Sequence, residues 1–159
     1  MSNIVYNRAK LRVATGDLDI DSDTIKVILL GTAPNGGAAE NPDTDDVASV
    51  LADADELDCT GNTGAARGAG GTGRKTLTST PSVDDSNNRA NVAHSGASWT
   101  ALSAGTDSAI AGYLIYEHVS GSDDALNFPI MYVNASPFSS VSLNGSDVSL
   151  PAGDWIRLA

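Results

Sequence analysis

The cluster of side chains best suited to metal binding consists of four aspartates at alternate positions, Asp17, Asp19, Asp21 and Asp23. Carboxylate oxygens are ligands that Ca²⁺ prefers, but an EF-hand loop also needs glycine at its sixth position and a carboxylate at its twelfth. Counted from Asp17, those positions hold Ser22 and Ile28. An EF-hand is therefore excluded. A looser calcium site is a weak candidate, and a solvated turn before a strand is the favoured interpretation.

A second pattern is the glycine-rich run over residues 68–76, which is similar to a loop that holds phosphates with backbone amides and a lysine. Here Lys75 comes one position late, and Arg74 takes its place. A phosphate loop must also lead from a strand into a helix, whereas residues 75–78 are typical of a strand. Flexible backbone entering a strand explains the same residues, and no cofactor is expected.

Nucleophilic chemistry has little support in the sequence. His94 and His118 lie on different expected strands, and no Gly-x-Ser-x-Gly elbow is present. Cys59 is the only cysteine, which excludes an intrachain disulfide and a thiolate metal site within one chain. We therefore expect two ordinary histidines, a structural cysteine and no enzymatic activity.

The length of 159 residues suits one domain over residues 1–159 that buries its apolar side chains without crosslinks. No apolar run approaches the roughly 20 residues that span a bilayer. Residues 1–10 lack the apolar core of a signal peptide. The sequence therefore predicts no membrane partner and no secretion.

The formal net charge of -11 predicts a surface that repels nucleic acid. Acidic residues concentrate in the segment 40–58, which has no lysine or arginine, whereas Arg8, Lys10 and Arg12 form a basic cluster. The basic cluster of one subunit could meet the acidic segment of a neighbour. The alternative is that both are ordinary solvated faces.

Hydrophobic periodicity predicts the elements of the first half. Residues 6–15 are expected to form a short helix ended by Gly16, and residues 24–30 a central strand. Residues 31–43 are expected to form a loop, and residues 46–57 a short acidic helix. The glycine-rich excursion over residues 60–73 is expected at the surface. Either contacts with neighbouring subunits or tight packing within one chain would hold it in place.

The second half is predicted to be all β. Residues 74–83 and 89–94 should form a hairpin around the turn Asp84–Asn88, and residues 108–118 should pair with 128–133. A third hairpin is expected around Asn144–Gly145, with a last strand over 155–158. The fold class is mainly β, a β-sandwich or β-barrel with one or two short helices and a long Gly-rich loop.

The two tryptophans, Trp99 and Trp155, are expected to be core or interface anchors before they are platforms for sugar stacking. With Arg8, Lys10 and Arg12 they make up the candidate interface residues. Exposure of either tryptophan beside a calcium-binding turn would favour a carbohydrate-binding module. Burial of both would argue against one.

Parts of the chain resemble, in order and spacing, a family of small structural proteins of tailed-phage particles. The residues that carry the resemblance are Tyr6-Asn7, Ala9-Lys10, Asp23 to Val27, Arg74 to Leu77, the turn Asp84 to Ala90, Trp99 to Leu102, Ala104 to Thr106 and Ile115-Tyr116. The match covers roughly the first three-quarters of the chain. Residues 31–59 depart from the family in length and acidity, and residues 153–158 are similar in character only.

The resemblance implies a virion component without enzymatic activity, located on either the head or the tail. A strongly acidic protein suits the outer capsid surface better than a surface that faces packaged DNA. The leading expectation is a capsid decoration, or cement, protein that bridges major capsid subunits and forms a homotrimer. The alternatives are a ring-forming tail or neck protein and a carbohydrate-binding module for host attachment.

Overall fold

The computed structural model describes residues 3–31, 37–63, 66–67, 71–119, 123–134, 138 and 141–158. The strands are β1 (Ile4–Val5), β2 (Ile25–Leu30), β3 (Lys75–Leu77), β4 (Ser79–Asp84), β5 (Arg89–His94), β6 (Ala97–Ser103), β7 (Gly112–Glu117), β8 (Phe128–Asn134), β9 (Asn144–Leu150) and β10 (Gly153–Leu158). The helices are α1 (Asn7–Thr15) and α2 (Val47–Asp53), with short 3₁₀ turns η1 (Ala38–Glu40) and η3 (Asp124–Leu126). The expected mainly-β class, with two short helices, is confirmed.

An antiparallel sheet of five strands in the order β1-β8-β7-β2-β3 forms the middle of the molecule. Its interior strands are apolar and buried on both faces, because layers of structure cover the sheet from both sides. On β2, Val27 and Leu29 belong to one buried cluster, whereas Ile28 and Leu30 belong to the other. This alternation follows from the two-residue period of a strand.

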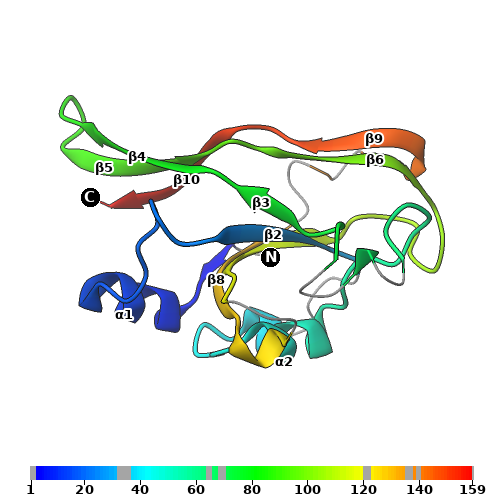
Figure 1. Cartoon of the computed structure of the whole chain (residues 1–159), viewed down its shortest axis with the longest axis horizontal. Helices are drawn as coiled ribbons and strands as arrows, with labels where there is room; N and C mark the ends of the chain where they lie inside the picture. Colours follow the sequence, from blue (N-terminus) through cyan, green and yellow to red (C-terminus); the bar gives the residue numbers. More distant parts are fainter. Residues whose placement is uncertain are drawn as a thin grey trace.

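A second layer of strands lies over one face of the five-stranded sheet (Figure 1). It consists of the sheet β10-β5-β4 and the pair β6-β9. The chain passes directly from β5 to β6 through Gly96, whose φ of +79° suits glycine. A Cβ at this position would come within 2.6 Å of the Leu150 carbonyl oxygen. The core between the two layers contains Trp99, Leu102 and Trp155, and the arrangement is that of a β-sandwich.

The opposite face of the five-stranded sheet is covered by α2 and the residues around it (Figure 1). Helix α2 begins after Asp46, whose side chain accepts a hydrogen bond from the Ser49 amide at 2.7 Å. It directs Val47 and Val50 into this second cluster, together with Tyr6. Helix α1 lies at one end of the molecule and is ended by Gly16 at φ +77°.

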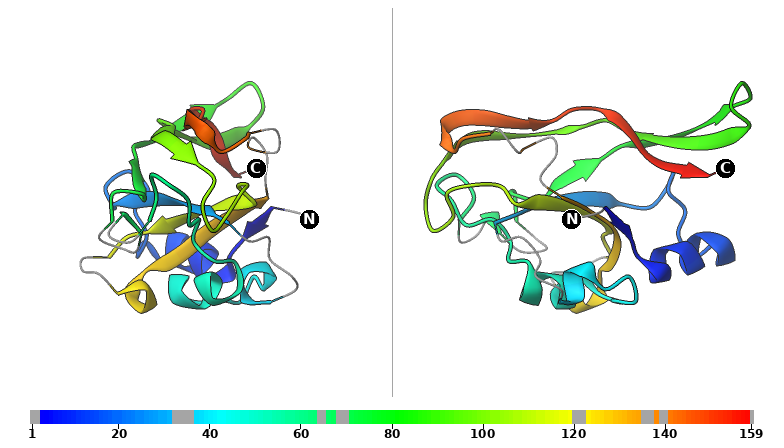
Figure 2. Two further views of the ribbon diagram at one scale, coloured as in Figure 1. Left: turned by 90° about the vertical axis from the view of Figure 1, so that its right-hand side faces the viewer. Right: turned by 180° about the vertical axis from the view of Figure 1, so that it is seen from behind.

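The outer part of the β4–β5 hairpin, residues 81–92 with their turn, projects past the five-stranded sheet, above α1. We call this part the arm. Figure 1 and the rear view in Figure 2 agree that the arm and α1 share one end of the molecule. β10 pairs with the side of β5 that β4 leaves open, so the arm continues a three-stranded sheet.

Most of the predicted elements are confirmed, and the differences lie mainly in the strands. The predicted strand 74–83 is divided, since β3 belongs to the five-stranded sheet and β4 to the other layer. The predicted hairpin around Asn144–Gly145 is wrong: these residues begin β9, which pairs with β6. Strand β6 was not among the predicted strands, because its sequence shows no clear apolar alternation.

Candidate functional site

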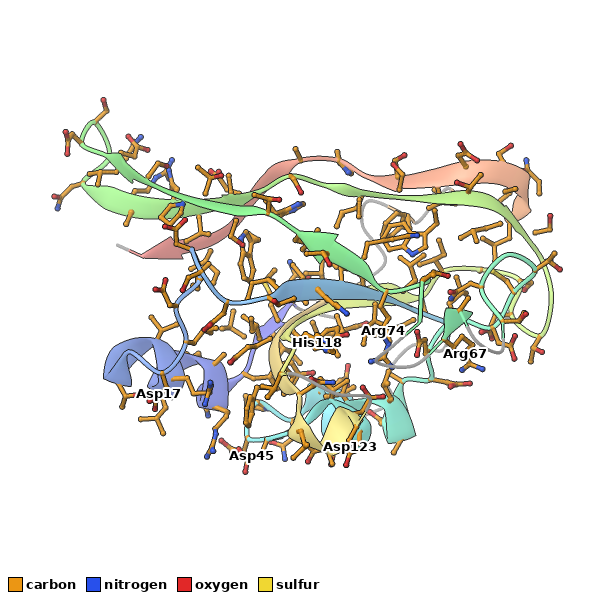
Figure 3. The ribbon with its side chains drawn as sticks, viewed as in Figure 1. Asp17, Asp45, Arg67, Arg74, His118 and Asp123 are labelled. Atoms are coloured by element: carbon orange, nitrogen blue, oxygen red, sulfur yellow. The ribbon has the colours of Figure 1, made fainter. Side chains whose placement is uncertain are left out.

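The most deeply buried charge of the described chain is Arg74, at the start of β3. Its side chain is 0% exposed and forms ion pairs with Glu56 at 2.7 Å and with Asp124 at 2.6 Å. The guanidinium carbon also lies 5.6 Å from the centre of the Tyr116 ring. Figure 3 shows Arg74 where the five-stranded sheet meets the segments beneath it.

Burial alone would lower the pKa of Arg74, since it disfavours the charged form. Hydrogen bonds to the carboxylates of Asp124 and Glu56 outweigh that effect, and the pKa is raised above its ordinary value. Arg74 therefore stays charged and joins three separate segments: β3, the chain after α2, and η3. It acts as an internal clamp.

Arg67 ties the glycine-rich excursion to the same region. It donates to Asp55 Oδ1 at 2.8 Å, to Asp58 Oδ2 at 3.2 Å and to the Glu56 carbonyl at 2.6 Å. The Trp99 indole N–H donates to the Gly73 carbonyl at the other end of the excursion. In its described residues the excursion is held by these contacts within the chain, and contacts with neighbouring subunits stay a prediction. Residues 64–65 and 68–70 lie outside the described part.

The predicted interface residues of α1 have different partners. Arg12 pairs with Glu117 at 2.8 Å and stacks over the Phe128 ring at 4.3 Å. Arg8 lies 5.6 Å from the same ring, so these two arginines do share a helix face. Lys10 is exposed and donates to Asn7 Oδ1 at 2.8 Å. Arg12 is therefore committed within the chain, whereas Lys10 remains at the surface.

The acidic segment 40–58 also has internal roles. Asp46 caps α2, and Asp53 accepts a hydrogen bond from the Ala39 amide at 3.1 Å. Glu56, Asp55 and Asp58 neutralise Arg74 and Arg67. Much of the charge on this segment is thus part of the fold, and its meeting with a neighbouring subunit stays a prediction.

The aspartates at 17–23 form a hydrogen-bonded turn. The Asp19 amide donates to Asp23 Oδ2 at 2.8 Å, and the Asp21 amide donates to Asp19 Oδ1 at 3.1 Å. Over the described ranges, no three His, Cys, Asp or Glu side chains are gathered in a way that could hold a metal ion. The geometry agrees with a turn before β2.

The two histidines lie in separate segments, His94 on β5 and His118 directly after β7. His94 is buried on β5, and its Nδ1 accepts a hydrogen bond from the Gly96 amide at 3.0 Å. Burial lowers the pKa of His94, and burial is also the main reason that the pKa of His118 is lowered. Cys59 is buried and free, and burial raises the pKa of its thiol. This favours a structural role for His94 and an unreactive thiol.

The resemblance of residues 68–76 to a phosphate loop ends at the strand β3. Lys75 begins that strand, and its ammonium donates to the Thr72 carbonyl at 2.7 Å. A helix N-terminus, the element that would face a bound phosphate, does not follow. This agrees with the expectation from the sequence.

Trp99 and Trp155 are both core residues, 2% and 8% exposed. Trp99 packs edge to face against Phe138, with ring centres 6.4 Å apart. Of the two expectations for the tryptophans, core and interface, the structure places both in the core. Neither side chain is available as a flat platform for a sugar.

An apolar pocket of about 290 Å³ opens beside α1, at the end of the molecule that carries the arm. Its lining residues are Val5, Ala9, Lys10, Val13, Ala14, Ile20, Ile130 and Ile156. Sequence reasoning singled out only Lys10 among them, because the pocket joins α1 to β1, β8 and β10 across the whole chain.

In the described part of the chain, no helix is long and apolar enough to cross a membrane.

Comparisons with models of protein families, with curated proteins and with solved structures find no match to this chain. The site must therefore be interpreted from its own geometry. That geometry consists of internal ion pairs that fix loops, a projecting hairpin and an open apolar pocket.

Proposed function

We propose that this chain is a non-enzymatic structural protein of a tailed-phage particle, and that it is a capsid decoration protein on the outer head surface. In this role it bridges major capsid subunits and forms a homotrimer. The observation that carries the proposal is the arm, a hairpin that projects from a two-layered body and bears the exposed apolar side chain of Val83. Such a side chain on a projection suits a contact with another protein.

The charge supports the outer surface of the head. A chain with a formal net charge of -11 is repelled by packaged DNA, whereas acidity on the outside of a particle keeps particles apart in solution. The internal ion pairs of Arg67 and Arg74 support the same role, because they hold long loops in fixed positions without a metal or a ligand. A fixed shape is what a bridging protein needs.

The burial of Trp99 and Trp155 argues against the carbohydrate-binding alternative, which required an exposed aromatic platform. The arm and the acidity of the chain are equally compatible with a ring-forming tail or neck protein. The two are distinguished by location and by symmetry, threefold for the decoration protein and sixfold for the ring.

The test is cryo-electron microscopy of intact particles that contain the chain, with the structure fitted into the density. Density on the outer capsid at threefold positions is expected. Density within the tail or neck would overturn the decoration role and favour the ring. Density in neither place would reject both.

A binding assay gives an independent readout. Purified chain is mixed with heads that lack it, and bound chain is measured after sedimentation. Purified tails from the same particles serve as the matched control surface. Saturable binding to heads alone is expected, together with greater resistance of the heads to heating.

A further inference from the structure

The underside of the arm, which faces α1, is apolar. Paired residues of neighbouring strands lie on the same face of a sheet, so Val83 shares a face with Ala90, and Pro81 shares it with Val92 and Ile156. Val92 is buried in the core, and Ile156 lines the pocket beside α1. The apolar face of the core therefore continues outward along the arm.

Val83 is the end of this apolar face. It is 76% exposed, the largest value among the exposed large apolar residues of the described chain. The opposite face of the arm is polar and carries the ion pair between Arg89 and Asp84 at 2.9 Å. An apolar side chain this exposed, on one defined face of a projecting hairpin, indicates a partner surface.

The pocket beside α1 has the size and chemistry to accept such a side chain. Its volume of about 290 Å³ is roughly twice that of the ~150 Å³ cavity that holds one benzene molecule in an engineered protein core. All its lining residues except Lys10 are aliphatic. A valine with part of its strand would fit there.

The charges around the two surfaces are complementary. Val83 is followed by Asp84 and Asp85, and Asp85 is exposed at the tip of the arm. Lys10 is exposed and lines the pocket. The apolar side chain of Val83 with Asp85 beside it thus matches an apolar pocket with one lysine in its lining.

We propose that the arm of one copy docks on the α1 pocket of a second copy, with Val83 in the pocket and Asp85 beside Lys10. This contact is heterologous, so it forms either closed rings or open filaments. Because the arm and the pocket share one end of the molecule, successive copies turn about an axis near that end, which favours a closed ring. The inference deepens the proposed structural role and rests on it for its biological setting.

The first experiment measures the mass of the purified chain by analytical ultracentrifugation from micromolar to near-millimolar concentration. The wild type is expected to self-associate. Val83→Asp and the milder, similarly shaped Val83→Thr should raise the dissociation constant, the first by roughly tenfold or more. Leu126→Asp is the matched control, because Leu126 is 54% exposed and lies on η3, away from the arm.

The second experiment is complementation. Ala14→Phe fills the pocket and leaves the arm intact, whereas Val83→Asp disables the arm and leaves the pocket intact. Each variant alone should be monomeric, and an equimolar mixture should form dimers. Circular dichroism and thermal unfolding confirm that each variant is folded.

The third experiment exchanges the charges. Lys10→Asp and Asp85→Lys should each weaken association, and the double variant should restore it. A wild type that stays monomeric, or Val83 and Ala14 variants that associate like Leu126→Asp, would overturn the proposal. If the wild type stays monomeric but binds an apolar probe dye, and Ala14→Phe abolishes that binding, the pocket would instead be assigned to a small ligand. All these measurements use the chain without particles, so they fail independently of the head-binding test.

Discussion

At the residue scale, Arg74 shows how an acidic chain uses its few cations. The chain holds 20 acidic residues against nine lysines and arginines, and it places Arg74 where the side chain is 0% exposed. A buried cation of this kind costs desolvation energy that its carboxylate partners offset. Its role is therefore to fix the arrangement of three segments more than to add net stability.

Removal of one partner of this clamp should be strongly destabilising. Glu56→Ala leaves the buried guanidinium partly unpaired and is expected to lower the free energy of unfolding by about 3 kcal/mol. The double variant Arg74→Met with Glu56→Leu should lower the free energy of unfolding by less than Glu56→Ala does, because it leaves no unpaired buried charge at these two positions. Urea unfolding of the single and double variants measures both values. This account would be contradicted if the double variant lost as much free energy of unfolding as the single variants Arg74→Met and Glu56→Leu lose when added together.

His94 makes stability depend on pH. Because burial lowers its pKa in the folded state, the unfolded chain binds a proton more readily. Its contribution is therefore complete above the ordinary histidine pKa of about 6.5 and is lost as the pH falls below that value. His94→Asn, whose side-chain oxygen can still accept from the Gly96 amide, should show a smaller loss between neutral pH and pH near 5.5, measured by urea unfolding. An unchanged pH dependence would assign the effect to other groups.

At the element scale, the end of α1 depends on one backbone conformation. Gly16 has φ +77°, and a Cβ built there meets no atom within 4 Å. The cost of Gly16→Ala is thus the strain of the left-handed region alone, about 1 kcal/mol. Gly153→Ala is the matched control, since its Cβ also meets nothing within 4 Å and its φ is not in that region. Thermal unfolding should show a lower Tm for the first variant and an equal or higher Tm for the second.

The elements that sequence reasoning found are those with strong local signals. Strands β2, β7 and β8 are mostly apolar runs, and α1 ends at a glycine. The signals that predict these elements therefore lie within the elements themselves. The β6–β9 pair was missed because Asn144–Gly145, a typical hairpin turn, here begins a strand. Gly145 has φ +89°, and the opposing strand has register shifts between Trp99 and Ser103, so the glycine marks an irregular sheet end.

The candidate site was less predictable than the fold. Arg74 meets Glu56 and Asp124 across 18 and 50 residues of sequence, and no local pattern encodes such pairings. The pocket unites residues from Val5 to Ile156 in the same way. Of the residues of the pocket and the arm, sequence reasoning named Lys10 as a candidate interface residue and did not single out Val83.

At the scale of the whole molecule, the net charge of -11 opposes compaction through self-repulsion. Added salt screens this repulsion, and the Debye length falls from about 8 Å at 0.15 M to about 3 Å at 1 M. We therefore expect the Tm to rise with NaCl concentration. The buried pairs of Arg74 are screened much less and should not reverse the trend. Replacement of the exposed Asp45 and Asp85 by asparagine should reduce the salt response, and a Tm that falls with salt would contradict the prediction.

The position of β10 has a consequence for synthesis of the chain. β5 pairs with β4 on one side and with β10 on the other, and β10 lies far beyond both strands in the sequence. Until residues 153–158 emerge, β5 has an open edge whose amides and carbonyls can pair with another strand. During synthesis, the edge of β5 is thus exposed to mispairing between the emergence of β5 and that of β10, and β10 then closes it.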